Sequence, residues 1–327
     1  MKISVIVPVY GIEKYIAHCA ESLFSQTFQD EVEFIFIDDC STDKSVEILH
    51  DVIECHPKLK SKIHVVRHEV NQGLPAARNT GLNIAKGEYI IHIDGDDYIE
   101  PTMLEDMYSE ATNKNADIVW TDIYLTYHDN ERYLSQPDYF TPKEALRGLL
   151  RGEMKYNVWN KLVRRDLYTK HKIMFPSGFG MGEDMTIIKL FCHASVVTHL
   201  PKAYYHYVKT NSQAFCQTYS SDHLKELLYN VSELSIYLRD YLEDDYKELI
   251  NLFQLEVKFP FLISDKKDRY YIWKNWFKEA NEFVWKNPTI SFRRKLLQGM
   301  ASLNQWWYVR LYYKVLYKTS LISILNR

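Results

Sequence analysis

The chain has 327 residues, of which 46% are apolar and 25% charged, and its formal net charge is -3 at pH 7. This composition is typical of a globular protein of about two domains whose core needs neither disulfides nor metals. It excludes the strongly basic surface of a typical nucleic-acid-binding protein, and no run of about 18 uncharged apolar residues predicts a membrane-spanning helix.

The cysteines are few and scattered along the chain: Cys19, Cys40, Cys55, Cys192 and Cys216. Their odd number and the lack of a closely spaced pair argue against a zinc site or a disulfide framework. The N-terminal apolar run is too short for a signal peptide. We therefore expect a cytoplasmic protein from a reducing compartment.

The first hundred residues alternate between strand and helix patterns. Short β-branched runs predict four strands, and apolar residues at helical spacing predict three helices between them. The expected elements, in chain order, are strand 3–10, helix 12–28, strand 32–41, helix 42–57, strand 62–69, helix 74–87 and strand 88–97. This order predicts an α/β fold, a Rossmann-like and mainly parallel sheet with helices on both faces. Ligands of such sheets bind beyond the carboxyl ends of the strands.

The rest of the chain is less regular at first and then helical. Helices and short strands mix between residues 101 and 212, where 117–128 is the clearest strand. From about residue 222 the pattern is helical to the end. No Gly/Ser/Pro-rich linker precedes this tail, so we expect it to pack on or beside the rest of the chain.

An acidic cluster follows the fourth expected strand and contains Asp94, Asp96 and Asp97. Three carboxylates within four residues repel one another unless a cation or hydrogen bonds compensate. Hard cations such as Mg²⁺ take oxygen ligands and bridge carboxylates to phosphates. The pattern fits either a metal site or a solvated acidic turn made flexible by Gly95.

A second acidic pair, Asp38 and Asp39, ends the second expected strand. These carboxylates fit a contact to a base N–H or a ribose hydroxyl, as in dinucleotide-binding folds. They fit equally a structural role as the cap of the next helix, which Ser41 or Asp43 could also provide.

Two further positions combine charge with a suggestive place in the pattern. Arg78 lies in the helix that leads into the acidic strand, where it could pair with a diphosphate or form an ordinary ion pair. Glu183 and Asp184 follow a glycine-rich loop and begin a helix. Either carboxylate could cap that helix, or one could be a general base on a mobile loop.

Taken together, these segments resemble the conserved blocks of a family 2 glycosyltransferase with the GT-A fold. The resemblance covers about residues 1–215 and rests on five segments in the family's order: ISVIVPVY, FIFIDDCSTDKS, NQGLPAARNTGLNIAKGEYIIHIDGDDYIEP, WNKLVRRDLY and GEDMTIIKLF. It implies a GT-A catalytic domain at 1–215, with a nucleotide-sugar half at 1–100 and an acceptor half at 101–215. Residues 216–327 would form a C-terminal helical region.

The resemblance also implies an activity and its partners. The enzyme would transfer a sugar, with inversion, from a nucleotide sugar, commonly a UDP-sugar. The acceptor would be a hydroxyl of a glycan or a lipid-linked molecule, and the cofactor would be Mn²⁺ or Mg²⁺. Such enzymes build polysaccharides and cell-surface glycans. The enzyme would lie in the cytoplasm or at the inner face of the membrane.

The resemblance assigns the nucleotide contacts to the first two strand ends. Pro8, Val9 and Tyr10 match the segment that meets the base, with Tyr10 as the stacking platform. Asp39 matches the carboxylate that reads the base, and Asp38 is its neighbour. The family often has Asn where this chain has Gly11 and Gly where it has Cys40, departures that blur the selectivity for the base but remove no charged ligand.

The remaining carry-over concerns the diphosphate and the reaction. Arg78 matches a residue near the uridine and diphosphate. Asp94 matches a ribose and metal ligand, and Asp96 a direct metal ligand. Asp184 matches the catalytic base. Two positions fall where the family often places metal or phosphate contacts, His206 and Lys209.

Two other classes of protein fit less well. A non-catalytic nucleotide-sugar-binding module would lack the base-reading or metal-binding carboxylates, which are all present here. A nucleotidyltransferase would carry a glycine-rich basic loop after the first strand, whereas the segment PVYGIEKY has one glycine.

The C-terminal segment 292–327 is basic and aromatic, and no acidic residue follows Glu282. Lys and Arg with Trp and Tyr on a helix suit an anionic membrane surface, so peripheral membrane association is one expectation. The alternative is a helical lid whose aromatic residues pack onto the enzyme.

Overall fold

The computed structural model describes residues 1–210, 220–242 and 246–317, and the chain divides into two compact units. Unit 1 comprises residues 1–146 and 155–232, and unit 2 comprises residues 147–154 and 233–327. The expected boundary after residue 215 and Cys216 both lie outside the described residues. The two units are divided after residue 232, within the helix Ser221–Tyr241.

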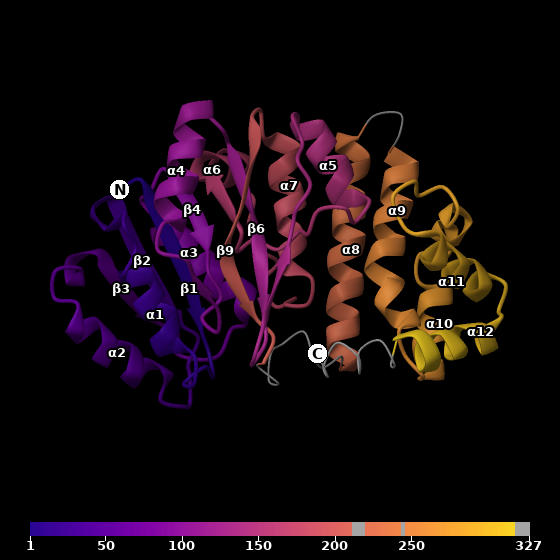
Figure 1. Cartoon of the computed structure of the whole chain (residues 1–327), viewed down its shortest axis with the longest axis horizontal. Coiled ribbons are helices and arrows are strands. Elements are labelled where there is room, and N and C mark those ends of the chain that lie inside the picture. The colour runs from indigo at the N-terminus through magenta and orange to yellow at the C-terminus, as the bar shows by residue number, and fades with distance from the viewer. Residues whose placement is uncertain (211–219, 243–245, 318–327) are drawn as a thin grey trace. The chain divides into compact units, whose positions relative to one another are not determined.

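The strands of unit 1 form one sheet in the order β3-β2-β1-β4-β8-β6-β9-β5, with β7 paired to β6. Their bounds are β1 Ile3–Val9, β2 Val32–Asp38, β3 Ile63–Arg67, β4 Tyr89–His92, β5 Tyr98–Ile99, β6 Ile118–Thr126, β7 Glu131–Leu134, β8 Lys161–Arg164 and β9 Val197–Val208. The first four strands pair in parallel, with β1 between β2 and β4, as their alternation with helices predicts. Figure 1 shows them side by side.

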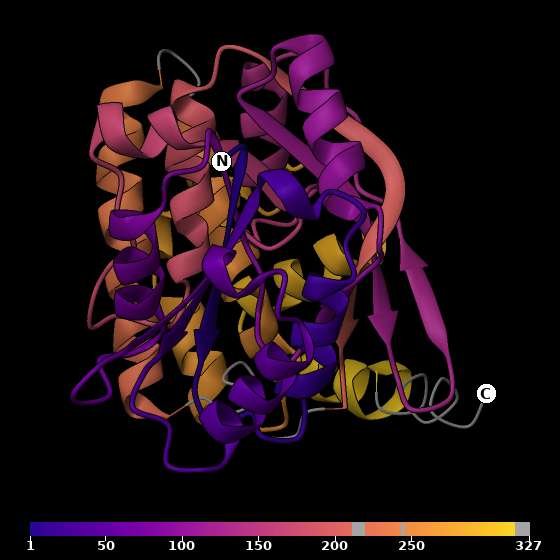
Figure 2. The ribbon, with the colours of Figure 1, turned by 90° about the vertical axis from the view of Figure 1, so that its left-hand side faces the viewer.

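The other half of the sheet is mixed. Strand β8 is antiparallel to both β4 and β6. Strand β9 is parallel to β6, and in Figure 2 its salmon arrow points the same way as the purple arrow beside it. The expected mainly parallel sheet is therefore confirmed for the N-terminal half only. A short loop joins β6 to β7, and such a loop can connect only antiparallel neighbours.

Helices cover the sheet of unit 1. Their bounds are α1 Ile16–Phe24, α2 Ser45–Cys55, α3 Leu74–Ile84, α4 Met103–Lys114, α5 Pro142–Leu150, α6 Arg165–His171, α7 Thr186–His193 and α8 Ser221–Tyr241, with α5 and α8 continuing into unit 2. Three short 3₁₀ turns are η1 Gln29–Glu31, η2 Lys60–Lys62 and η3 Glu183–Met185. Helix α1 begins four residues later than its apolar pattern predicts.

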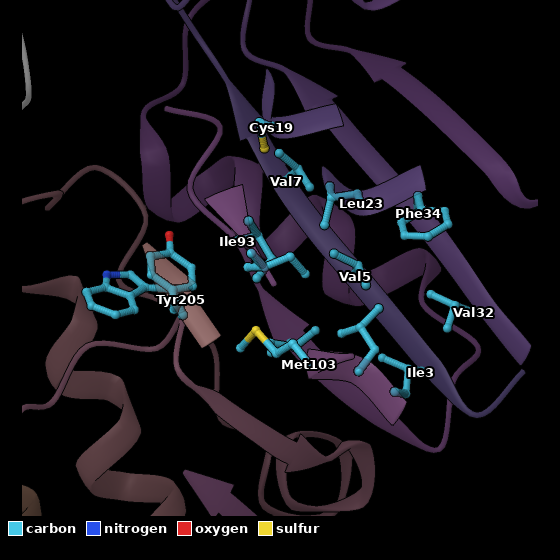
Figure 3. Packing of buried hydrophobic residues seen from close by; sticks show 14 of the residues in the cluster. Ile3, Val5, Val7, Cys19, Leu23, Val32, Phe34, Ile93, Met103 and Tyr205 are labelled. Carbon is cyan, nitrogen blue, oxygen red and sulfur yellow. The ribbon is translucent and has the colours of Figure 1, made fainter. Parts of the chain in front are cut away.

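The core of unit 1 lies on both faces of β1. Val5 and Val7 point to one face and pack with Leu23 of α1 and Met103 of α4 (Figure 3). Ile6 points to the other face, where a Cβ at Gly81 of α3 would lie 2.4 Å from its Cγ2. This alternation makes β1 a strand buried on both faces, and each such side chain contributes about 1.5–3 kcal/mol of burial free energy.

Unit 2 is helical, as the sequence predicts. Its elements beyond α8 are α9 Tyr246–Lys258, η5 Phe259–Leu262, α10 Lys267–Asn275, η6 Lys278–Phe283, α11 Phe292–Ser302, α12 Trp306–Leu311 and the π-helical turn η7 Tyr312–Tyr317. Trp273 and Phe253 are fully buried in its core. Within the described residues, no helix has the length and apolar character to span a bilayer.

Candidate active site

Three polar segments come together at the carboxyl edge of the sheet. Val9 pairs with Asp38, so Tyr10 and Asp39 follow neighbouring strand ends, and the Asp39 N–H donates to the Val9 carbonyl over 2.9 Å. The acidic turn after β4 lies against the end of β1, since a Cβ at Gly95 would be 3.0 Å from the carbonyl oxygen of Pro8. Close packing therefore explains Gly95 better than flexibility does.

The segment assigned to the base ends in an exposed ring. Pro8 is half-buried and Val9 buried, whereas Tyr10 is exposed just beyond the end of β1. The Tyr10 ring is therefore accessible for stacking, as the base-contact prediction requires.

Asp39 is buried and accepts hydrogen bonds on both oxygens. Its Oδ1 accepts from the Gln72 N–H and lies 2.7 Å from Nδ1 of His68, and its Oδ2 accepts from the Gly73 N–H over 2.8 Å. The other ring nitrogen of His68 lies 2.9 Å from the Thr80 hydroxyl of α3. Asp39 thus holds the loop before α3. A base N–H would have to share these carboxylate oxygens with the backbone N–H groups of the loop.

Asp38 caps the turn after its strand. Its Oδ1 accepts from the Ser41 N–H over 2.8 Å, and its Oδ2 lies 3.3 Å from Nε of Arg67. Asp38 therefore has a structural role in this turn, but it does not cap the next helix, because α2 begins only at Ser45 and its N-cap residue is Lys44. Cys40 between these residues has a φ of 61°, a left-handed conformation that favours glycine. This conformation explains why glycine is common at the equivalent position.

Arg78 connects the acidic turn to the loop before α7. Its Nη2 lies 2.9 Å from Oδ1 of Asp94, and its Nη1 lies 2.5 Å from Oε1 of Glu183 and 2.8 Å from Oδ1 of Asp184. The guanidinium also sits over the Phe175 ring, 5.4 Å from its centroid. Since the Arg78 side chain is only 1% exposed, a diphosphate could reach it only if one of these ion pairs opened.

Negative charge exceeds positive charge around this guanidinium. Burial raises the pKa of Asp94 to about 6, opposed by Arg78 and reinforced by Asp96 and Asp184. Burial and the neighbouring Asp184 also raise the pKa of Glu183 well above its usual range. Several carboxylates thus share one fixed cation, an arrangement that a second cation would stabilise.

The geometry distinguishes the two carboxylates that could act as the base. Glu183 is 6% exposed, and its second oxygen accepts from the Asp184 N–H. The Asp184 side chain is 31% exposed, and only its Oδ1 accepts a hydrogen bond from the described residues. Asp184 therefore has an oxygen open to solvent. Glu183 uses its two oxygens to hold Arg78 and the backbone of Asp184.

The loop that carries these carboxylates is held by the N-terminal part of α8. Asn230 donates from Nδ2 to the carbonyls of Phe179 and Met181, both over 2.9 Å, and the Met181 N–H donates to Glu226. The Phe179 ring also stacks on Tyr229 at 3.9 Å. The sequence predicts that the glycines let this loop move. The structure shows that contacts with α8 hold the loop in place.

The third carboxylate of the acidic turn faces inward. Asp97 accepts from the Tyr205 hydroxyl over 2.6 Å and from the Val208 N–H over 2.7 Å. The same hydroxyl accepts from the Asp94 N–H over 3.2 Å, and Trp159 stacks on the Tyr205 ring at 4.1 Å. Asp97 therefore ties the turn to β9, while Asp96 is half-buried beside it.

His206 and Lys209 lie along β9 and just beyond it. The ring nitrogens of His206 lie 2.7 Å from Glu131 and 2.9 Å from Glu100, and Nζ of Lys209 lies over the Tyr207 ring. A metal at His206 would have to displace one of these carboxylates. Over residues 1–210, 220–242 and 246–317, no three His, Cys, Asp or Glu side chains form a ready metal cluster.

Sequence reasoning overlooked several supporting residues. His68 follows β3 directly, so the strand-end rule that selected Asp39 also applied to it. Tyr205, Glu226 and Asn230 had no such signal, because their partners lie at least 45 residues away in the sequence.

The comparison with known families agrees with this geometry. Residues 4–187, more than half of the chain, match the model of Glycosyl transferase family 2. The chain belongs to this family. The match extends from β1 to the loop with Asp184 and so includes the carboxylates around Arg78.

Two curated relatives illustrate the family. The chain is 29% identical to the uncharacterized glycosyltransferase EpsJ of Bacillus subtilis, over 80% of this chain and 77% of the relative. It is 30% identical to the cholesterol galactosyltransferase of Borreliella burgdorferi, over 83% of this chain and 77% of the relative. The protein is thus a family 2 glycosyltransferase.

Solved structures establish the fold of this glycosyltransferase. The crystal structure of an S. aureus TarS fragment with UDP-GlcNAc has a TM-score of 0.70 and 24% identity, and covers 96% of this chain and 92% of its own. The mannosyltransferase PcManGT of Pyrobaculum calidifontis, with GDP-Man and Mn²⁺, has a TM-score of 0.57 and 16% identity. The match covers 96% of this chain and 83% of the PcManGT chain. The GT-A fold with a helical C-terminal region is therefore confirmed.

Proposed function

We propose that this glycosyltransferase moves a sugar from a UDP-sugar to a hydroxyl of a glycan or lipid-linked acceptor, with inversion at the anomeric carbon. The observation that carries the proposal is the bridge made by Arg78. One guanidinium joins Asp94, at the end of the nucleotide-side strand, to Asp184, on the loop before α7. Donor-side and acceptor-side carboxylates are thus held at one place.

The donor would lie across the ends of β1, β2 and β4. Tyr10 offers an exposed ring for the base, and Asp39 offers acceptor oxygens beside it. UDP is the nucleotide favoured by the TarS complex with UDP-GlcNAc, although PcManGT was solved with GDP-Man. Support for UDP therefore comes from the nearer of these two structural neighbours.

Asp94 and Asp96 fit a divalent cation that arrives with the diphosphate. Mg²⁺ is commonly bound by one or two carboxylates together with substrate phosphates, so a dedicated cluster of protein ligands is not required. Burial is the main cause of the raised pKa of Asp94, and the neighbouring Asp96 and Asp184 add negative charge that a cation would offset. When bound, Mn²⁺ or Mg²⁺ would neutralise the charge of the leaving diphosphate. His206 stays in the proposal as a ligand only if its pairs with Glu100 and Glu131 open.

Asp184 would act as the general base. Its open oxygen would take the proton of the acceptor hydroxyl while that oxygen attacks the anomeric carbon and the bond to the diphosphate breaks. A single displacement inverts the anomeric centre and needs no carboxylate nucleophile, unlike a retaining glycosidase. Arg78 would hold Asp184 in a fixed direction.

The relatives support the class of acceptor. One acts on cholesterol, as its name states, and S. aureus TarS is a poly(ribitol-phosphate) β-N-acetylglucosaminyltransferase. Lipid and polymer hydroxyls are thus both represented in the family. We place the enzyme at the cytoplasmic face of the membrane, in the synthesis of a cell-envelope glycan.

A donor screen tests the proposal. The full chain is incubated with Mn²⁺ and a panel of UDP-, GDP- and dTDP-sugars, and both released nucleoside diphosphate and the thermal shift are measured. We expect a UDP-sugar to give the largest stabilisation and the fastest release. Stabilisation without release from any donor and acceptor mixture would favour a binding module. A preference for a GDP-sugar would contradict the assignment of the nucleotide.

A further inference from the structure

Unit 2 exposes large apolar side chains around its C-terminal helices. Trp307 and Leu311 lie one turn apart on α12 and are 61% and 50% exposed, and Leu303 at the end of α11 is 67% exposed. Trp285 and Phe292 are also exposed and in ring contact, with centroids 6.3 Å apart. These five residues are called the apolar surface below.

The core of unit 2 does not account for the apolar surface. The same helices already pack inward through Leu297 and Ala301 of α11 and Val309 of α12, all fully buried. Trp306 stacks on Tyr270 of α10 with a centroid distance of 5.4 Å. These helices therefore carry apolar residues on two sides, one packed in the core and one exposed. Exposed apolar residues in this number are unusual on a helix face that contacts only water.

The segment of chain that carries the apolar surface is basic in sequence. Between residues 283 and 327 the chain has eight Lys or Arg residues and no Asp or Glu. Lys286 and Arg293 are exposed and follow Trp285 and Phe292 directly. Lys314, three residues after Leu311, is exposed as well. Exposed aromatic rings next to exposed basic side chains match the interface of an anionic bilayer.

We propose that the apolar surface docks unit 2 onto an anionic lipid bilayer. Trp285 and Trp307 would lie at the headgroup level, Phe292, Leu303 and Leu311 would enter the acyl boundary, and the basic side chains would contact lipid phosphates. A second copy of this chain is a poorer occupant, because it would bring the same positive charge. The proposal rests on the proposed function only in that a lipid-linked acceptor gives docking a purpose.

The side of these helices that packs within unit 2 is thus distinct from the side proposed to dock. The inner residues stabilise unit 2, so a truncation before α11 would remove part of its core. Point variants of the outer residues are the appropriate test. Phe140 of unit 1 is a matched control, since it is also a large exposed aromatic residue.

The experiment is cosedimentation of the full chain with vesicles, with no donor present. Wild type should bind vesicles of mixed phosphatidylcholine and phosphatidylglycerol and should not bind phosphatidylcholine alone. The double variant Trp307→Ser/Leu311→Ser should lose binding by about ten-fold or more, because it removes two apolar side chains that would leave water on docking, whereas Phe140→Ser should bind as wild type does. Circular dichroism and UDP release from the donor should be unchanged in all variants, which separates this test from that of the activity.

A second arm tests the charge. Arg293→Glu/Lys314→Glu should weaken binding to the anionic vesicles strongly, and Lys58→Glu, an exposed lysine of unit 1, should have little effect. Equal binding to neutral and anionic vesicles, or wild-type binding by the Trp307/Leu311 variant, would overturn the proposal. It would also be overturned if wild type bound no vesicles but formed dimers that the same variant dissociates, since the surface would then be a self-association interface.

Discussion

Nη1 of Arg78 donates to Oδ1 of Asp184 over 2.8 Å, joining α3 to the loop before α7 across 106 positions of sequence. The same side chain reaches Asp94 through its other terminal nitrogen. A planar guanidinium can make both contacts at once in a fixed geometry, which a lysine cannot. The distance between the candidate base and the acidic turn is therefore set by one residue.

The first prediction separates the two carboxylates of the loop. Asp184→Asn should lower kcat by about 10²–10⁴-fold, because Asn keeps the size of the side chain but cannot accept the proton. UDP affinity should be nearly unchanged, since a base acts in the transition state. Glu183→Gln should cost less turnover and more thermal stability, because Glu183 is buried between Arg78 and the Asp184 N–H. Steady-state transfer with UDP calorimetry checks both variants; the reverse pattern would make Glu183 the base.

The second prediction concerns the bridge. Arg78→Ala should reduce the free energy of unfolding by about 3–5 kcal/mol, because it leaves the buried Glu183 and the partly exposed Asp94 and Asp184 without their shared partner. Arg78→Lys should be more stable than Arg78→Ala but should still lose activity, since one ammonium cannot span Asp94 and Asp184. The control is Arg164→Lys, which alters another arginine paired with two carboxylates, Asp117 and Glu88.

The pH profile of the Arg78→Lys variant tests the electrostatic effect of Arg78 on Asp94. Arg78 lowers the pKa of Asp94, which burial raises to about 6. A lysine keeps the unit charge but loses one of the two guanidinium contacts, so a weakened contact with Asp94 should let this carboxylate bind its proton at higher pH. The acid limb of kcat/KM should then move to higher pH. A loss of activity with an unmoved limb would mean that Arg78 acts through geometry alone.

The third prediction concerns the cation. Chelation with EDTA should abolish transfer, and Mn²⁺ should restore it. Asp96→Ala should abolish the Mn²⁺-dependent part of UDP binding without lowering the melting temperature, because Asp96 is only half-buried. Asp30→Ala changes an exposed carboxylate at the far end of β2 and serves as the control. Wild-type UDP affinity of Asp96→Ala in Mn²⁺ would remove Asp96 from the metal site.

The fourth prediction follows from the backbone at Cys40. A left-handed conformation costs a residue with a side chain about 1–2 kcal/mol, and glycine loses part of this advantage through the entropy of the unfolded chain. Cys40→Gly should therefore stabilise the protein by a few tenths to about 1 kcal/mol. Cys40→Val should destabilise it, because a β-branched residue tolerates this conformation poorly. Urea unfolding of both variants checks the order, and equal midpoints would show that the turn is not strained.

The fifth prediction concerns His92, whose ring nitrogens have no hydrogen-bond partner among the described residues. Burial, with Arg78 nearby, holds its pKa well below the usual value. The unfolded chain therefore binds a proton below about pH 6.5 that the folded chain does not, and stability is lost as the pH falls.

The variant His92→Phe isolates this effect, since Phe can pack against the same neighbours, Tyr168 and Phe175. Between pH 7.5 and 5.5, wild type should lose about 1.4 kcal/mol relative to the variant, if His92 stays neutral in the fold. Other groups change stability with pH in both proteins, so only the difference is diagnostic. Parallel pH dependences would show that His92 is protonated in the folded protein.

The sequence by itself determined the strands of the N-terminal half of the sheet and the polar residues at their ends. Alternation of strand and helix patterns fixes parallel pairing, and parallel pairing brings strand ends to one edge. Tyr10, Asp39 and Asp94 could therefore be placed together without coordinates. The resemblance to the family added Asp184, and the helical character of the tail was clear from its periodicity.

Only the tertiary structure decided which of these residues touch. The ion pairs of Arg78 with Glu183 and Asp184, the hydrogen bond of Tyr205 with Asp97, and the bracing of the loop by Asn230 join segments that are far apart in sequence. Periodicity records which side of an element is buried, but it carries no information on what lies against that side. The mixed pairing around β8 and the exposed side of α12 were hidden for the same reason, since both depend on packing between distant elements.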